Sequence, residues 1–416
     1  MKFKRTLTWL LALGISSSLF LQTPVSVRAE AEQTAAVSEI STNAIPGWPQ
    51  GPDISSTAAV IMEDSTETVL YAKNMDTALF PASTVKIMTC LLALENSSLE
   101  DEVTMTATGV SGVTDGGANI AAQLDEVFTM EQCLYAIMVA SANDIALQVA
   151  EHVGGSVENF VQMMNTRAQE LGCTNTVFTN PTGLPDPNQH TTAHDMALIM
   201  KTAIDNSTLQ TMAGTTSYNL SATNKSGGGR VLTSTFPMRT PSEPSYYDGC
   251  IGGKEGYTEA SGSTLVCAAE KNGTRLICVI LNGASEQTPS EAVSLLDYGF
   301  QNFQKISLED KDFSILSGGT IILPAGVSSD SLTTSETETD GQIQRKYLYN
   351  GTVVGSAIAE NIQPEDTSVA DAGKANLLAA RQFSSEKTQI PYFIIGGIGL
   401  ILFILLFIKM IKIIKS

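Results

Sequence analysis

The chain has 416 residues, 43% of them hydrophobic, and a formal net charge of -19 at pH 7. This length is sufficient for one large and one small domain, each with its own hydrophobic core. Because a strongly acidic chain repels phosphate backbones, the composition argues against nucleic acid as a partner.

The beginning of the chain has the features of an export signal. Three basic residues within the first five positions precede an apolar run over residues 7–21. Val27 and Ala29 then have the spacing of a signal-peptidase site. We therefore predict a cleaved secretory signal over 1–29, and an exposed linker over 30–53, which is rich in small and polar residues.

Residues 54–304 have the pattern of one α+β domain. Two strand-like runs, Thr57–Met62 and Thr68–Ala72, predict a hairpin. Helical periodicity follows in five segments, at residues 83–94, 130–140, 143–153, 157–171 and 193–204. Strands return at 264–269 and 275–281, joined by Asn-Gly, and a helix over 291–303 follows. Strands at the two ends of a domain can pair into one antiparallel sheet, with the helices between them in sequence forming a cluster.

The next region is predicted to be all-β. Residues 305–362 contain strand-like runs at 320–323, 342–348 and 353–358, the last two joined by another Asn-Gly turn. We predict a small separate β domain here, followed by a polar stalk over 363–389.

The end of the chain is predicted to cross a membrane. Ile390–Ile408 is an uncharged and almost wholly apolar run of 19 residues, which matches the hydrocarbon core of a bilayer. Three lysines follow it. Since positive charge stays on the cytoplasmic side, we predict a transmembrane helix over 390–410, a cytoplasmic tail over 411–416 and a catalytic body outside the cell.

The first candidate site motif is Ser83-Thr84-Val85-Lys86. On a helix, residues three apart share one face, so Lys86 can approach the Ser83 hydroxyl. A serine at a helix start also lies beside free N–H groups and the positive dipole end, which suits a nucleophile whose attack creates an oxyanion. Taken alone, a capped helix with a solvated lysine explains the motif better.

Two further motifs are weak when taken alone. Ser141 and Asn143 lie between two predicted helices, where both side chains can face a cleft, although helix capping is the simpler explanation. Lys254 and Gly256 lie just before the Asn-Gly hairpin. There, a lysine can hold an anionic group and a glycine lets a substrate backbone approach closely.

The three motifs in this order resemble the active-site signature of the penicillin-binding and serine β-lactamase group. Their flanks resemble the low-molecular-weight D-alanyl-D-alanine carboxypeptidases, peptidase family S11, over about residues 55–362. The segments that carry this resemblance are Phe80–Thr89, Ala140–Asp144, Asn180–Leu184, Thr191–Ala197 and Gly253–Thr258. It implies a penicillin-binding, β-lactamase-like transpeptidase domain followed by the small β domain.

The resemblance implies catalysis through an acyl-enzyme. We expect no cofactor, and no metal because the chain has only three histidines and no HExxH motif. Ser83 would attack the carbonyl between two D-alanines of a peptidoglycan stem peptide. Lys86, neutral in a desolvated site, would be its base. Ser141 would relay the proton to the leaving amine, and Asn143 would hold Lys86 and the substrate amide. β-Lactams would be covalent inhibitors.

The resemblance also assigns the substrate-binding strand. Lys254 would orient the substrate, and Gly256 would allow its close approach. The backbone N–H groups of Ser83 and Tyr257 would form the oxyanion hole. Glu255 departs from the family, which usually has Thr or Ser here, with a hydroxyl that helps bind the terminal carboxylate of the substrate.

An ionised Glu255 would repel that carboxylate. Three interpretations stay open: the side chain points away, it is protonated, or the protein is weak or prefers another substrate. No arginine occurs from Leu281 to Phe303, where some relatives place a carboxylate-binding one. The alternatives to a carboxypeptidase are a catalytically silent relative that binds wall peptides and, with less support, a serine β-lactamase.

The chain has six cysteines and no CxxC pair. Four of them, Cys90, Cys133, Cys267 and Cys278, lie in apolar runs and are interpreted as small buried residues. A disulfide stays open as the alternative.

Overall fold

The computed structural model describes residues 40–113, 117–308, 313–339 and 342–361. The predicted signal, stalk, transmembrane helix and cytoplasmic tail all lie outside these ranges. Within them, no helix is both long enough and apolar enough to cross a bilayer.

A five-stranded antiparallel sheet lies at the centre of the larger domain, in the order β2-β1-β9-β8-β7. The predicted strands from the two ends of the domain do pair, for example Val60 with Val279. The Asn-Gly turn joins β8 to β9, with positive φ at Asn272 and Gly273. The strands are β1 (Ala58–Glu63), β2 (Val69–Lys73), β7 (Cys250–Thr258), β8 (Gly262–Lys271) and β9 (Thr274–Gly283).

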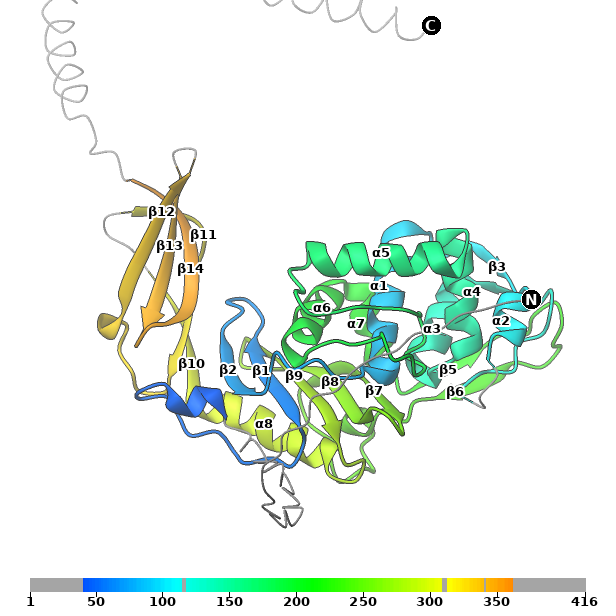
Figure 1. The fold of residues 1–416 in the computed structure, drawn as a ribbon, viewed down its shortest axis with the longest axis horizontal. Helices are drawn as coiled ribbons and strands as arrows, with labels where there is room; N and C mark the ends of the chain where they lie inside the picture. The colour runs from blue at the N-terminus through cyan, green and yellow to red at the C-terminus, as the bar shows by residue number, and fades with distance from the viewer. Residues whose placement is uncertain (1–39, 114–116, 309–312, 340–341, 362–416) are drawn as a thin grey trace, which may run out of the picture.

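Helices cover both faces of this sheet (Figure 1). The predicted helices are confirmed as α1 (Lys86–Asn96), α3 (Met130–Ala140), α4 (Asn143–Gly154), α5 (Val157–Glu170) and α6 (Ala193–Asp205), which gather on one side, and α8 (Thr288–Asn302) on the other. Alternation along β1 supplies both cores: Val60 and Met62 pack with the helical cluster, whereas Ile61 packs with α8.

Several short elements of this domain were not predicted. They are η2 (Ala82–Val85), α2 (Ala107–Ser111), α7 (Ser207–Ala213), β3 (Glu102–Thr104), β4 (Val127–Thr129), β5 (Ser217–Leu220) and β6 (Arg230–Thr233). One of them changes a prediction, because the helix expected from residue 83 begins as the 3-10 turn η2 and becomes an α-helix only at Lys86.

The second domain is an antiparallel sheet in the order β10-β11-β14-β13-β12, which confirms an all-β region after α8. Figure 1 shows it at one end of the molecule, beside β2 and α8. Its strands are β10 (Phe303–Ser307), β11 (Phe313–Pro324), β12 (Thr333–Thr339), β13 (Gln342–Tyr349) and β14 (Thr352–Asn361).

Within the described residues from 40 onwards, Trp48 departs from the prediction of an exposed linker over 30–53. Trp48 is only 4% exposed, and its indole N–H donates a 2.8 Å hydrogen bond to the Leu70 carbonyl. The centroid of its ring lies 5.1 Å from the ring centroid of Phe303 and 6.3 Å from that of Tyr349. This segment therefore joins the core that the two domains share.

The six cysteines are all buried and free. The interpretation of Cys90, Cys133, Cys267 and Cys278 as small buried residues is confirmed, and no pair of the six forms a disulfide.

Candidate active site

Ser83 lies in the turn η2, which is held between β7 and the loop around Gly183. Ala82 adopts a φ of 49°, in the left-handed region that L-residues rarely occupy. A Cβ at Gly183 would come within 1.8 Å of the Ala82 carbonyl oxygen, so only glycine permits this approach. The loop thereby fixes the backbone just before the candidate nucleophile.

The strand β7 approaches Ser83 from the other side. A Cβ at Gly256 would lie 2.5 Å from the Ser83 backbone nitrogen. The Thr264 hydroxyl lies 3.1 Å from the carbonyl oxygens of both Pro81 and Gly256, so it links the turn to the strand. This contact brings the backbone of Gly256 and Tyr257 beside the Ser83 N–H, where the resemblance places the oxyanion hole.

Lys86 has the environment of a base. It is fully buried, and its Nζ lies 3.0 Å from Ser83 Oγ and 2.5 Å from the Thr182 carbonyl oxygen. Burial, followed by the nearby charge of Lys254, holds the pKa of Lys86 well below its usual value. The alternative of a capped helix with a solvated lysine is therefore wrong, and η2 also has no side-chain cap.

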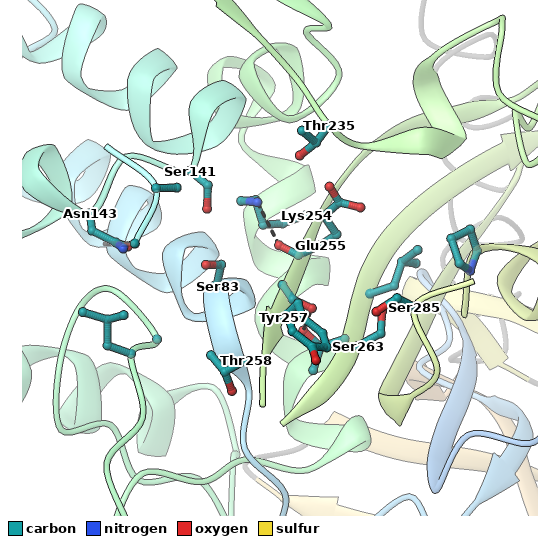
Figure 2. Close-up of a pocket in the computed structure, with 18 residues that line it drawn as sticks. Ser83, Ser141, Asn143, Thr235, Lys254, Glu255, Tyr257, Thr258, Ser263 and Ser285 are labelled. Carbon is teal, nitrogen blue, oxygen red and sulfur yellow. Dashed lines mark hydrogen bonds between the residues drawn. The ribbon is translucent and has the colours of Figure 1, made fainter. Parts of the chain in front are cut away.

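Ser141 and Asn143 face the same cleft (Figure 2). Ser141 ends α3 in a left-handed conformation, with φ 55° and ψ 30°. Asn143 begins α4 but caps nothing with its side chain, so the helix-capping explanation fails for it. Its Oδ1 is buried without a hydrogen-bond partner. The resemblance implies a contact between Asn143 and Lys86, but no hydrogen bond joins these two described residues.

Asp144 is a positioning residue that the sequence did not reveal. Its buried carboxylate accepts hydrogen bonds from the backbone N–H groups of Ile120, Ala122 and Ile145. These bonds hold the loop that faces Asn143 against the start of α4, because a carboxylate that accepts several N–H groups orders the backbone around it.

Lys254 lies on β7 and is 4% exposed. Its Nζ donates a 2.8 Å hydrogen bond to the backbone carbonyl of Glu255, and Figure 2 shows the amine pointing towards Ser141. Burial lowers the pKa of Lys254 to about 8. The amine is therefore mostly protonated at neutral pH, and it gives the cleft a positive charge beside the nucleophile.

Glu255 is half-buried in the cleft wall. Figure 2 shows its carboxylate turned towards Thr235, from the far side of the cleft relative to Asn143. Burial raises the pKa of Glu255, while the Thr235 hydroxyl and Lys254 oppose that rise. The Glu255 side chain therefore points away from Ser83 but still lines the cleft.

The cleft encloses about 360 Å³. Besides the predicted residues it contains the hydroxyl group of Thr258, at the end of the third-motif segment, and those of Thr235, Ser263 and Ser285, which no motif revealed. These residues belong to separate segments of the chain. Ser263 lies at the cleft because the register of β7 and β8 pairs it with Tyr257. Among the described lining residues there is no arginine. No group of three or more His, Cys, Asp or Glu side chains in the described ranges is arranged to hold a metal.

Comparison with known proteins agrees with this geometry. The family model of D-alanyl-D-alanine carboxypeptidase, Peptidase_S11, matches residues 46–285. The carboxypeptidase DacF of Bacillus subtilis is 32% identical over 254 residues, which are 59% of this chain and 62% of that protein. This chain thus spans less than two thirds of the length of that relative. A D-alanyl-D-alanine carboxypeptidase of a Streptomyces species is 31% identical over 264 residues, 60% of this chain and 88% of that protein.

The fold is also that of solved relatives. Penicillin binding protein 5 from Haemophilus influenzae has a TM-score of 0.64 at 24% identity, and the match covers 76% of this chain and 98% of that one. This likeness establishes a mixed α and β penicillin-binding fold with antiparallel sheets. With the family match over more than half of its length, the chain belongs to the D-alanyl-D-alanine carboxypeptidase family, peptidase family S11.

Proposed function

We propose that the protein is a serine-type D-Ala-D-Ala carboxypeptidase, which removes the terminal D-alanine of peptidoglycan stem peptides through an acyl-enzyme on Ser83. The observation that carries this proposal is the fully buried Lys86 amine 3.0 Å from the Ser83 hydroxyl, in a cleft that also presents Ser141, Asn143 and Lys254. The family match over residues 46–285 supports it.

In the acylation step, Ser83 Oγ attacks the carbonyl carbon between the two D-alanines while its proton passes to the neutral Lys86 amine. The carbonyl oxygen becomes an oxyanion, which accepts hydrogen bonds from the N–H groups of Ser83 and Tyr257. A donor of this kind lowers the barrier by roughly 2.7–4 kcal/mol.

The tetrahedral intermediate then collapses and the C–N bond breaks. The proton held by Lys86 passes through the Ser141 hydroxyl to the leaving amine, and D-alanine departs. Water attacks the ester and gives its proton to Lys86, and the same two donors stabilise the second oxyanion. Cleavage of the ester bond returns a proton to Ser83 Oγ and releases the shortened peptide.

Asn143 and Lys254 are assigned to substrate binding. The unpartnered Oδ1 of Asn143 would accept an N–H of the substrate, since a buried acceptor without a partner is costly. The charged amine of Lys254 would orient the peptide and favour the oxyanion at close range.

Intact-mass analysis after exposure to a β-lactam tests the proposal. We expect one added β-lactam mass on the wild-type protein and none on Ser83→Ala, together with Ser83-dependent release of D-alanine from a stem peptide. A folded protein that takes up no label would be a silent relative. A label that is lost within seconds, without release of D-alanine, would indicate a β-lactamase.

We further propose that the body lies outside the cell, joined to the membrane by the apolar run Ile390–Ile408. Truncation before Ile390 should release active protein from the membrane fraction. If the truncated protein stays with the membranes, this assignment of the anchor is wrong.

A further inference from the structure

The catalytic cleft does not end at Glu255. A second hollow of about 670 Å³ adjoins it and shares three lining residues with it, Glu255, Ser285 and Pro289. The hollow continues along the start of α8 and the loop after η3 (Pro237–Arg239). The two hollows are therefore neighbours that meet at Glu255, Ser285 and Pro289.

The second hollow is acidic. Glu243 and Glu286 line it in addition to Glu255, and among its described lining residues there is no lysine or arginine. Arg239, at the base of the loop, donates instead to the backbone carbonyls of Gly214 and Cys250. The Lys254 amine faces Ser141 and does not line the second hollow. The negative charge of this hollow is therefore not balanced from within it.

The side of the cleft that each half of the substrate occupies follows from the role proposed for Asn143. The buried Oδ1 of Asn143 has no partner, and it accepts a substrate N–H in the proposed function. Figure 2 shows Asn143 and Glu255 on opposite sides of Ser83. If the acyl half of the peptide lies at Asn143, the leaving half lies at Glu255 and continues into the acidic hollow.

We propose that the site also cleaves D-alanyl bonds whose leaving group is an extended, cationic amine, such as a diamino-acid amide, and that Glu255 is the residue that selects it. This inference rests on the proposed function, because the same Ser83 performs both reactions. A leaving group that ends in a carboxylate meets a like charge at Glu255. One that carries an ammonium group and no free carboxylate meets an opposite charge at Glu255, beside a second acidic hollow.

Three peptides with the same acyl half, diacetyl-L-Lys-D-Ala, test the inference. Their leaving groups are D-Lys-amide, D-Ala-amide and free D-Ala, which differ in charge from positive through neutral to negative. We expect kcat/KM to fall in that order, over roughly tenfold in total, and the span to shrink as salt screens the charges. Glu255→Gln should compress the span to within about threefold, by raising the free-acid rate and lowering the D-Lys-amide rate.

Glu102→Gln is the matched control, since Glu102 is an exposed glutamate on β3, outside both hollows. It should leave the order and the span unchanged. Labelling of Ser83 with a fluorescent penicillin, measured on every variant, reports that each protein is folded and able to acylate.

The inference would be overturned if the wild type preferred free D-Ala, or if Glu255→Gln did not change the span of rates. In either case, labelling of Ser83 would leave the proposed function intact. Absence of both labelling and cleavage would reject the proposed function as well.

Discussion

Two lysines share the cleft, and their surroundings give them different charges. Lys86 is fully buried near a second cation, so the pKa of Lys86 lies well below its usual value and the neutral form of its amine is favoured. Lys254 is also desolvated, but the neighbouring Glu255 opposes the fall, and the pKa of Lys254 stays at about 8. A neutral base and a charged anchor can therefore coexist at neutral pH, as the proposed acylation requires.

This difference predicts a bell-shaped pH dependence for acylation of Ser83 by a fluorescent penicillin. As pH falls through the lowered pKa of Lys86, the amine gains a proton and can no longer accept one from Ser83. As pH rises through about 8, Lys254 loses its charge. Lys254→Arg should move only the alkaline limb upward, because a guanidinium stays protonated. An unchanged alkaline limb in that variant would contradict the assignment.

Asn143 gives a prediction that separates binding from stability. Its buried Oδ1 lacks a partner, which costs about 1–3 kcal/mol in a folded protein. Asn143→Leu removes this acceptor at similar volume, so the free energy of unfolding in urea should stay the same or rise. Peptide kcat/KM should fall roughly tenfold, which corresponds to one lost substrate hydrogen bond. A parallel loss of stability would show instead that the residue is structural.

At the scale of elements, the site depends on the contact between η2 and β7. A Cβ at Gly256 would lie 2.5 Å from the Ser83 nitrogen and 2.9 Å from the Ala82 Cβ. Gly256→Ala should therefore push the strand from the turn and separate the two oxyanion donors, which lowers the acylation rate by about 10²–10³. Gly228→Ala is the control, because a Cβ at Gly228 would meet no atom within 4 Å and its φ is not in the left-handed region. Equal rates in both variants would argue against the strand contact as the source of the oxyanion hole.

Some contacts of these elements can be predicted from the sequence and others cannot. The Ser83–Lys86 contact is predictable because it is set by local helical geometry, and the start of α3 at Met130 is fixed by a capping box between Thr129 and Gln132. The Thr235 and Ser285 hydroxyls are not predictable, since loops distant in sequence bring them to the cleft.

Two other elements escaped prediction for different physical reasons. Strand β12 is an edge strand of Thr, Ser and Glu with no apolar alternation, so it carries no periodic signal. Residues 40–53 have the composition of a linker, and a single tryptophan gives them a buried anchor that average composition conceals.

At the scale of the whole molecule, one hydrophobic core joins the two domains. It contains Trp48, Tyr71 from the central sheet, Tyr298 from α8, and Ile322 and Tyr349 from the small domain. Such a shared core predicts that the domains unfold together rather than independently.

Trp48→Ala tests this coupling. Loss of a buried aromatic ring should lower the free energy of unfolding by about 3–5 kcal/mol, in a single transition. Since Trp48 lines neither hollow, the rate of penicillin acylation by the folded fraction should not change. The measurement is urea unfolding followed by tyrosine fluorescence and by far-UV circular dichroism, since the variant keeps no tryptophan after the predicted signal. Two separate transitions in the wild type would contradict a shared core.

A buried ion pair also crosses the boundary between the domains, because the Lys305 amine on β10 lies 3.0 Å from the Glu63 carboxylate at the end of β1. Glu63 is fully buried and also accepts hydrogen bonds from Ser65 and Thr66, whereas Lys305 is partly exposed. Lys305→Met leaves the carboxylate buried without its cation and should cost about 3 kcal/mol of unfolding free energy, at the low end for a broken buried pair.

Adding Glu63→Gln to Lys305→Met removes the unpaired charge and should restore part of that loss, so the two changes should be strongly non-additive in urea unfolding. Additive losses would mean that the pair contributes nothing across the boundary. In that case the aromatic core alone would hold the small β domain in place. Lys305 would only compensate the charge of a carboxylate that β1 buries.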